Sequence, residues 1–261
     1  MRSADTGTQT VRLRIWRGDS QAGRFVEYSV PFNDGEVVLD VVHRVQATLA
    51  PDLAVRWNCK AGKCGSCSAE IDGRPRLMCM TRMSLFDRDS PLTIAPLKTF
   101  PAERDLVTDV GFNYAVAGRV PPLAPRQTEP GEHHRIWDAD IERVQEFHRC
   151  IECFLCQDVC HVLRDHESNK NKFVGPRHLV RLAELEMHPI DTADRRATAR
   201  HDLGISYCNI TRCCTEVCPA GIAITDNAII PMKERVADRF FDPLRLLAAK
   251  LRSRPDSGPA K

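Results

Sequence analysis

The sequence predicts an α+β protein made of a β-rich N-terminal half and an all-α C-terminal half. Two observations lead to this prediction. The N-terminal half contains short runs in which apolar and polar residues alternate, which is the period of a half-buried strand. The C-terminal half carries apolar residues at helical spacing between groups of cysteines, and helices that join such groups need no sheet.

The predicted N-terminal elements follow in the order strand, strand, helix and short strands. Alternation predicts strands over 10–16 and 25–30. Apolar residues at helical spacing predict an amphipathic helix over 37–49. Further short strands are expected at 69–71, 76–78 and 92–95, with a hairpin turn at Asp72-Gly73. This order is typical of a small α+β domain.

Composition sets the expected domain boundaries. Residues 118–135 hold four prolines and two glycines, and proline cannot continue a helix, so a linker is expected there. Helices are predicted over 140–148, 176–188 and 226–240. The expected parts are a first domain at 8–117, the linker at 118–135, a helical domain at 136–248 and a disordered tail at 249–261.

Charge and cysteine content exclude several classes of protein. The 37 Lys and Arg nearly cancel the 35 Asp and Glu, so no broad electrostatic footprint for nucleic acid is expected. No apolar run approaches the ~18 residues of a membrane helix, and the first ten residues lack the apolar core of a secretion signal. The 12 cysteines therefore belong to a chain that looks cytosolic, where thiols stay reduced and ligand roles are favoured over disulfides.

The first cysteine group has the spacing of a plant-type [2Fe–2S] site. It consists of Cys59, Cys64, Cys67 and Cys79, which is C-x4-C-x2-C with a distant fourth cysteine. Gly62 and Gly65 interleave these cysteines and allow backbone N–H groups to approach the sulfurs. The alternative is a structural zinc site, but such sites usually use paired cysteine knuckles, and only Cys64–Cys67 forms one.

The other eight cysteines form two runs of the bacterial ferredoxin type. The first run is Cys150-x2-Cys153-x2-Cys156-x3-Cys160. The second run, Cys208 to Cys218 followed by proline, has the same spacing except that Thr211 stands at its second ligand position. In two-cluster ferredoxins the fourth cysteine of a run ligates the other cluster.

Exchange of the fourth cysteines predicts two different clusters. Four thiolates predict a [4Fe–4S] cluster held by Cys150, Cys153, Cys156 and Cys218. Three thiolates predict a [3Fe–4S] cluster held by Cys160, Cys208 and Cys214. Threonine is a poor iron ligand, so the corner at Thr211 should stay empty. Cys213 could compete with its neighbour, but only Cys214 reproduces both spacings, and Cys213 is expected to be a buried, inert thiol.

With three motifs in this order, the chain resembles the iron–sulfur subunit of succinate dehydrogenase and fumarate reductase. The resemblance runs from about residue 10 to about residue 245. Its carriers are WNCKAGKCGSCSAEIDGRPRLMC (57–79), CIECFLCQDVC (150–160), NKFVGPRHL (171–179) and CNITRCCTEVCP (208–219). The resemblance implies a β-grasp, plant-ferredoxin-like domain followed by an all-α, bacterial-ferredoxin-like domain.

The resemblance also implies a function. Electrons would leave an FAD-containing flavoprotein subunit that oxidises succinate, pass through [2Fe–2S], [4Fe–4S] and [3Fe–4S], and reach quinone at a membrane anchor subunit. The reverse flow would reduce fumarate. The chain would be a peripheral subunit on the cytoplasmic face of the membrane. It would not be catalytic alone, since it has no G-x-G-x-x-G dinucleotide motif after a strand.

Two segments depart from the family pattern and indicate a divergent branch. The first loop reads CKAGKCGSC where members often show CREGICGSC. His161 stands where a proline usually follows the run, and no tryptophan lies nearby. The residues expected near the quinone are His161, Asn209 and Thr211.

Two other functions remain open from the sequence. The chain could be the iron–sulfur subunit of another flavoprotein, such as a hydroxyacid oxidase or a heterodisulfide-reductase-like complex. It could also be a zinc-stabilised or cluster-sensing interaction module, in which case a zinc-loaded protein would be colourless rather than brown.

Overall fold

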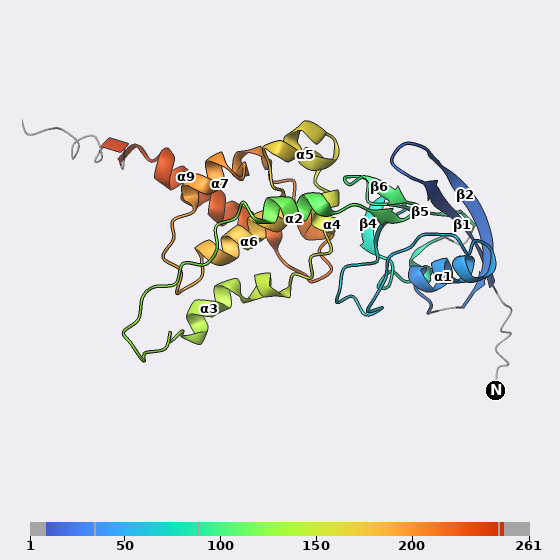
Figure 1. Cartoon of the computed structure of the whole chain (residues 1–261), viewed down its shortest axis with the longest axis horizontal. Coiled ribbons are helices and arrows are strands. Elements are labelled where there is room, and N and C mark those ends of the chain that lie inside the picture. The colour runs from blue at the N-terminus through green and yellow to red at the C-terminus, as the bar shows by residue number, and fades with distance from the viewer. Residues whose placement is uncertain (1–8, 34, 88, 245, 248–261) are drawn as a thin grey trace, which may run out of the picture.

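A five-stranded mixed sheet forms the first half of the molecule. In sheet order the strands are β2 (Gly23–Phe32), β1 (Gln9–Gly18), β5 (Leu92–Ala95), β3 (Ser68–Ile71) and β4 (Arg74–Leu77). β1 runs antiparallel to β2 and parallel to β5, and β3 runs antiparallel to both of its neighbours. The structure, a computed structural model, describes residues 9–33, 35–87, 89–244 and 246–247 (Figure 1).

The core of this half lies between the sheet and one helix. Val11, Leu13 and Ile15 alternate inward along β1, as the sequence pattern predicts. Helix α1 (Val38–Thr48) buries its apolar face in the same core. β4 begins two residues earlier than predicted, because the two-residue turn at Asp72-Gly73 already sets Ile71 opposite Arg74.

Four short elements complete the first half and its exit. They are the 3₁₀ turn η1 (Met83–Leu85), strands β6 (Ala102–Arg104) and β7 (Val107–Thr108), which pair with each other, and helix α2 (Gly111–Ala117). None was predicted, because segments this short show no clear periodicity. Val116 of α2 is already buried in the core of the second half.

Short helices and helical turns build the second half. They are α3 (Asp138–Gln145), η2 (Glu146–Arg149), α4 (Leu155–Asp158), α5 (His161–Arg164), η3 (Glu167–Asn171), α6 (Pro176–Glu186), α7 (Arg196–His201), η4 (Ile205–Tyr207), α8 (Cys213–Glu216), η5 (Ile224–Ile229) and α9 (Ile230–Phe240). The helix predicted over 226–240 is split: η5 is a π-helical turn, and α9 follows it. Pro231 has no backbone N–H to donate to the preceding turn, which explains the break.

The proline-rich segment is packed against the helical half. Val120 is buried in its core. The buried guanidinium of Arg195 donates to the carbonyl oxygens of Pro121, at 3.1 Å, and Pro122. These contacts hold the proline-rich segment against the helical half, although its composition indicated only an extended linker. The tail predicted at 249–261 lies outside the described residues.

The two halves pack against each other at the start of the cysteine run over 150–160. Cys153, Phe154 and Leu155 belong to the core of the sheet half, although they come from the helical half of the chain. The Phe154 ring meets the rings of Phe100 and Tyr114 edge to face, at centroid distances of 6.4 and 5.9 Å. Figure 1 shows α2 and α4 next to the sheet and α9 at the opposite end.

Ion pairs between charged side chains also join the two halves of the molecule. Arg164 of α5 forms ion pairs with Glu70 of β3 and, at 3.4 Å, with Asp158 of α4. The backbone N–H of Thr99 donates to Asp158 Oδ1 at 2.9 Å. Burial raises the pKa of Asp158 to about 7.

The sheet in the first half and the helices in the second half confirm the α+β class predicted from the sequence. In the described residues no helix is long and apolar enough to cross a membrane.

Candidate iron–sulfur centres

The first cysteine group occupies the loop before β3 and the turn after β4. Cys59 and Cys64 are half-buried, whereas Cys67 and Cys79 are buried. Backbone N–H groups point at the sulfur atoms: Lys63 N lies 3.2 Å from Cys59 Sγ, and Cys79 N lies 3.4 Å from Cys67 Sγ. Such N–H donors stabilise negative charge on the sulfurs and tune the potential of a bound cluster.

Ionisation differs within this group. Burial works against the Cys64 thiolate, but hydrogen bonds from Ser66 and from the backbone of Cys59 outweigh burial and lower the pKa of Cys64 to about 6. Burial raises the pKa of Cys67 to about 12. Cys67 therefore needs a bound metal cation to stay deprotonated as a thiolate.

The second cysteine group surrounds one small cavity. Its members are Cys150, Cys153, Cys156 and Cys218, which come from the loop before α4, from α4 and from the loop after α8. The fourth member is distant in sequence yet close enough to disfavour ionisation of the other three. Burial raises the pKa of Cys153 to about 12 and raises that of Cys156 well above its usual value. The structure therefore brings together the four residues predicted to hold the [4Fe–4S] cluster.

The third cysteine group surrounds a second small cavity. Its predicted ligands Cys160, Cys208 and Cys214 line it. Burial raises the pKa of Cys160 to about 12 and that of Cys214 to about 11. The structure therefore also brings together the three residues predicted to hold the [3Fe–4S] cluster.

Other predicted residues line this third cavity as well. His161, Asn209 and Thr211 do so, and Asn209 Nδ2 lies 2.7 Å from His161 Nε2. Cys213 is half-buried rather than buried, and its Sγ lies 3.3 Å from Thr211 Oγ1. The expectation of a buried thiol at Cys213 is thus wrong, because the residue opens α8 at the rim of the cavity.

The backbone of the two cysteine runs repeats. Glu152 and Phe154 have left-handed φ values of 53° and 60°, and Ile210 and Arg212 have left-handed φ values of 63° and 65°. In both runs these residues stand two and four places after the first cysteine, and a short helix begins at the next residue. Non-glycine residues rarely adopt this conformation, so its repetition at matching places aligns the loops independently of the side chains.

This alignment pairs residues of the two runs one to one. Thr211 corresponds to Cys153, Cys214 corresponds to Cys156, and Cys213 corresponds to Leu155, whose side chain is buried in the core of the sheet half. Thr211 therefore has the place in its loop that Cys153 has in the other run, whereas Cys213, which also lines the third cavity, has the place of Leu155.

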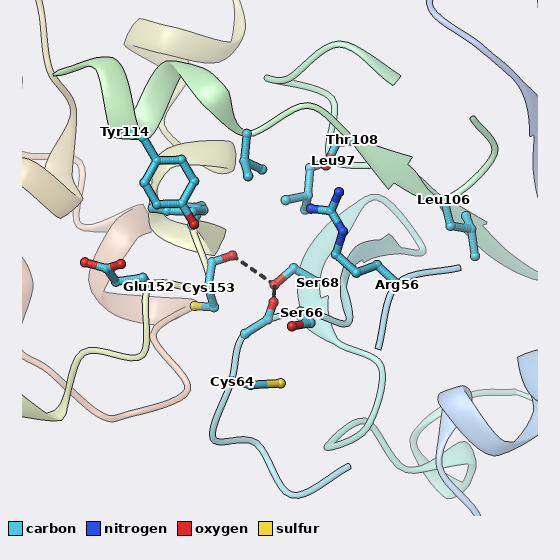
Figure 2. A pocket seen from close by; sticks show the side chains of 13 residues that line it. Arg56, Cys64, Ser66, Ser68, Leu97, Leu106, Thr108, Tyr114, Glu152 and Cys153 are labelled. Carbon is cyan, nitrogen blue, oxygen red and sulfur yellow. Dashed lines mark hydrogen bonds between the residues drawn. The ribbon is translucent and has the colours of Figure 1, made fainter. Parts of the chain in front are cut away.

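The three groups follow one another through the molecule. Gly65, in the first loop, lies against the backbone of Cys153 in the second group. Ser68 Oγ joins them, at 2.8 Å from the Gly65 carbonyl oxygen and 2.9 Å from that of Cys153. Figure 2 shows the pocket at this junction, lined by both Cys64 and Cys153. Cys156 of the second group is in turn an electrostatic neighbour of Cys214 in the third.

The residues present fit clusters rather than isolated ions. Within the described residues, no three His, Cys, Asp or Glu side chains are arranged to hold a single metal ion. Thiolates that share an iron–sulfur cluster bind different irons of one centre. The thiol-lined cavities and the N–H groups directed at sulfur suit that arrangement.

Two residues of the site were missed from the sequence. Ser68 joins the first and second loops, and Arg177 lines the second cavity. A serine beside a cluster loop and an arginine in the first turn of a helix are common residues. No local signal distinguishes them, because their roles depend on contacts with distant segments.

Comparisons with known proteins agree with this arrangement. The family model of a 2Fe-2S iron-sulfur cluster binding domain matches residues 12–113, and that of a 4Fe-4S dicluster domain matches residues 146–222. The chain is 30% identical to the fumarate reductase iron-sulfur subunit of Mycobacterium tuberculosis, over 77% of this chain and 81% of that protein. It is 28% identical to the succinate dehydrogenase iron-sulfur subunit of Paracoccus denitrificans, over 89% and 90%.

A solved structure is more similar still. A chain of the Mycobacterium smegmatis Sdh1 complex in the apo form matches with a TM-score of 0.89 and 63% identity, over 91% of this chain and 100% of that one. Both cluster domains, the sequence relatives and this fold agree with the resemblance carried by the cysteine motifs. The chain belongs to the family of iron–sulfur subunits of succinate dehydrogenase and fumarate reductase.

Proposed function

We propose that this chain is the electron-transfer subunit of a succinate:quinone oxidoreductase. It receives single electrons from the FAD of a succinate-oxidising flavoprotein subunit and delivers them to quinone at a membrane anchor subunit. The observation that carries this proposal is the continuous row of three thiol groups. Gly65 against Cys153 links the first group to the second, and Cys156 beside Cys214 links the second to the third.

Eleven cysteines hold the three centres. Cys59, Cys64, Cys67 and Cys79 hold [2Fe–2S]; Cys150, Cys153, Cys156 and Cys218 hold [4Fe–4S]; Cys160, Cys208 and Cys214 hold [3Fe–4S]. The alignment of Thr211 with Cys153 supports the three-thiolate site, because threonine lacks a thiolate at the position where the other run supplies one. The bound clusters supply one-electron redox chemistry, and the protein supplies their spacing and electrostatics.

The third cavity is the place where the electrons would pass to quinone. His161 and Asn209 lie at this cavity and offer polar hydrogens to a quinone carbonyl. Ile210, which lines the cavity, and Tyr207 close by in the chain both remain half-exposed. Such side chains suit contact with an anchor subunit, which would hold the chain peripherally at the cytoplasmic face of the membrane.

Succinate oxidation is favoured over fumarate reduction. The Sdh1 complex chain is 63% identical to this chain, whereas the fumarate reductase and succinate dehydrogenase subunits named above are 30% and 28% identical, so the Sdh1 match carries this preference. The same three centres would carry electrons in reverse in a fumarate reductase, so that activity is the second candidate.

Anaerobic purification of the intact complex through a tag on this chain tests the proposal. We expect about nine irons and ten sulfides per chain, and a three-iron EPR signal after air oxidation. Succinate should reduce quinone faster than quinol reduces fumarate. Cys208→Ser should abolish quinone reduction while succinate still reduces a flavoprotein-directed dye. An iron-free chain, or a chain that copurifies with no flavoprotein, would contradict the proposal.

A further inference from the structure

Arg177 is a buried cation beside the second cysteine group. It stands in the first turn of α6 and lines the same cavity as Cys150, Cys153, Cys156 and Cys218. Its side chain is only 11% exposed, and its Nη2 donates to Glu152 Oε1 at 2.6 Å. Glu152 itself lies in the loop between the first two of these cysteines. An ion pair thus borders the cavity, with its cationic member the more buried.

Two of the guanidinium donors lack an acceptor. The Nε and Nη1 atoms of Arg177 are buried, and neither forms a hydrogen bond with any residue of the described part of the chain. Buried donors are almost always paired, and an unpaired donor on a charged group is costly. The cavity that Arg177 shares with four thiols offers the missing acceptors: the sulfur atoms of a bound cluster.

The charge of Arg177 borders the four thiols. A guanidinium does not lose its proton in proteins. Arg177 lines the cavity and is 11% exposed, whereas its partner Glu152 does not line the cavity and is 52% exposed. The positive member of the ion pair is therefore the one that borders the sulfurs, and water screens the negative member.

We propose that Arg177 raises the reduction potential of the second cluster. Its N–H groups donate to cluster sulfur, and its fixed positive charge stabilises the reduced form, which carries one more negative charge, relative to the oxidised form. One electron enters the cluster and Arg177 keeps its proton, so no proton or ligand is transferred. The inference rests on the four-iron cluster of the proposed function.

The test is a potentiometric EPR titration of the second centre in the intact complex. Arg177→Met should lower its midpoint potential. At the unaltered protein's midpoint, we expect the ratio of reduced to oxidised cluster to fall about tenfold, which is 59 mV for one electron. Arg177→Lys, which keeps the charge, should retain most of the potential. Glu152→Gln, which removes the opposing charge, should raise it.

Arg181→Met is the matched control. Arg181 lies one turn further along α6, is 44% exposed and pairs with Glu184 at the surface. Its replacement removes the same charge and the same functional group, but from a solvent-exposed side chain that does not line the cavity. The second potential should therefore stay unchanged in this variant, and the first and third potentials should stay unchanged in all variants.

Each outcome decides the matter. An unchanged second potential in an iron-replete Arg177→Met complex would overturn the inference, as would an equal shift in Arg181→Met. If the Arg177→Met complex fails to assemble, Glu152→Gln provides the test. An unchanged or lowered midpoint potential of the second centre in that variant would contradict the proposed effect of Arg177. Absence of a four-iron signal from the unaltered complex would instead refute the proposed function on which the inference rests.

Discussion

Gly65 lies so close to Cys153 that a Cβ atom at position 65 would stand 2.6 Å from the Cys153 Cα. Gly65 also has a left-handed φ of +69°. Glycine meets both requirements, because it has no Cβ and adopts positive φ readily. At this point the first cysteine loop therefore approaches the second group backbone against backbone, and this approach depends on the absence of a side chain.

Gly65→Ala should weaken the junction between the two halves. The new methyl group meets backbone atoms that cannot rotate away, so we expect a cost of about 1–3 kcal/mol beyond that of the left-handed φ. Gly73→Ala is the matched control, since Gly73 has a φ of +70° but open space around its Cβ position. Thermal or urea unfolding, followed by cluster absorbance, measures both. Equal loss of stability in the two variants would contradict the predicted crowding.

Thr211→Cys should convert the three-iron centre to a four-iron centre. Residue 211 has the same place in its loop as Cys153 has in the other run, so a thiolate there completes the fourth corner. The three-iron EPR signal of air-oxidised protein should disappear, and the iron content should rise by about one per chain.

Cys213→Ser is the control for that conversion. Cys213 corresponds to Leu155 and not to a ligand. The three-iron signal should persist unchanged in this variant. Its loss, or an unchanged three-iron signal in Thr211→Cys, would show that the third site uses a different set of thiols.

Exchange of ligands between the two runs predicts which centre each cysteine serves. Cys160→Ser should remove the third centre and leave the second, because Cys160 lines the third cavity although it ends the first run. Cys218→Ser should remove the second centre and leave the third, because Cys218 lines the second cavity. EPR of the oxidised and reduced protein distinguishes the two centres. Ligation without exchange would produce the reverse pattern of losses.

Arg164→Met should destabilise the folded chain strongly. The substitution leaves two buried carboxyl groups, Glu70 and Asp158, without their shared cation, which typically costs about 3–5 kcal/mol above the Asp158 pKa of about 7, where Asp158 is ionised. Arg181→Met removes a surface partner of Glu184 and should cost about 0–1 kcal/mol. Denaturant unfolding of the iron-loaded chain provides the comparison. Similar costs in the two variants would indicate that the buried ion pairs do not hold the halves together.

Much of the molecule could be predicted from local sequence. The strand at 92–95 and the helix over 37–49 were found because burial on one face imposes a period of 2 or 3.6 residues. The cysteine sets were predicted from the spacing within each run and the exchange of distant fourth cysteines, and the structure brings the second and third sets together around two cavities. The proline-rich composition at 118–135 correctly excluded a long helix there.

Only the tertiary structure decided how these parts meet. Composition could not show that Arg195 binds the carbonyl oxygens of Pro121 and Pro122, because the partners are more than 70 residues apart. Nor could a periodic pattern reveal that Gly65 touches Cys153, or that Arg177 lines the second cavity and has two buried donors without partners in the described residues. The predicted ligand sets follow from spacing along the chain. The separation and electrostatics of the centres follow from packing between distant segments, which leaves no periodic trace in the sequence.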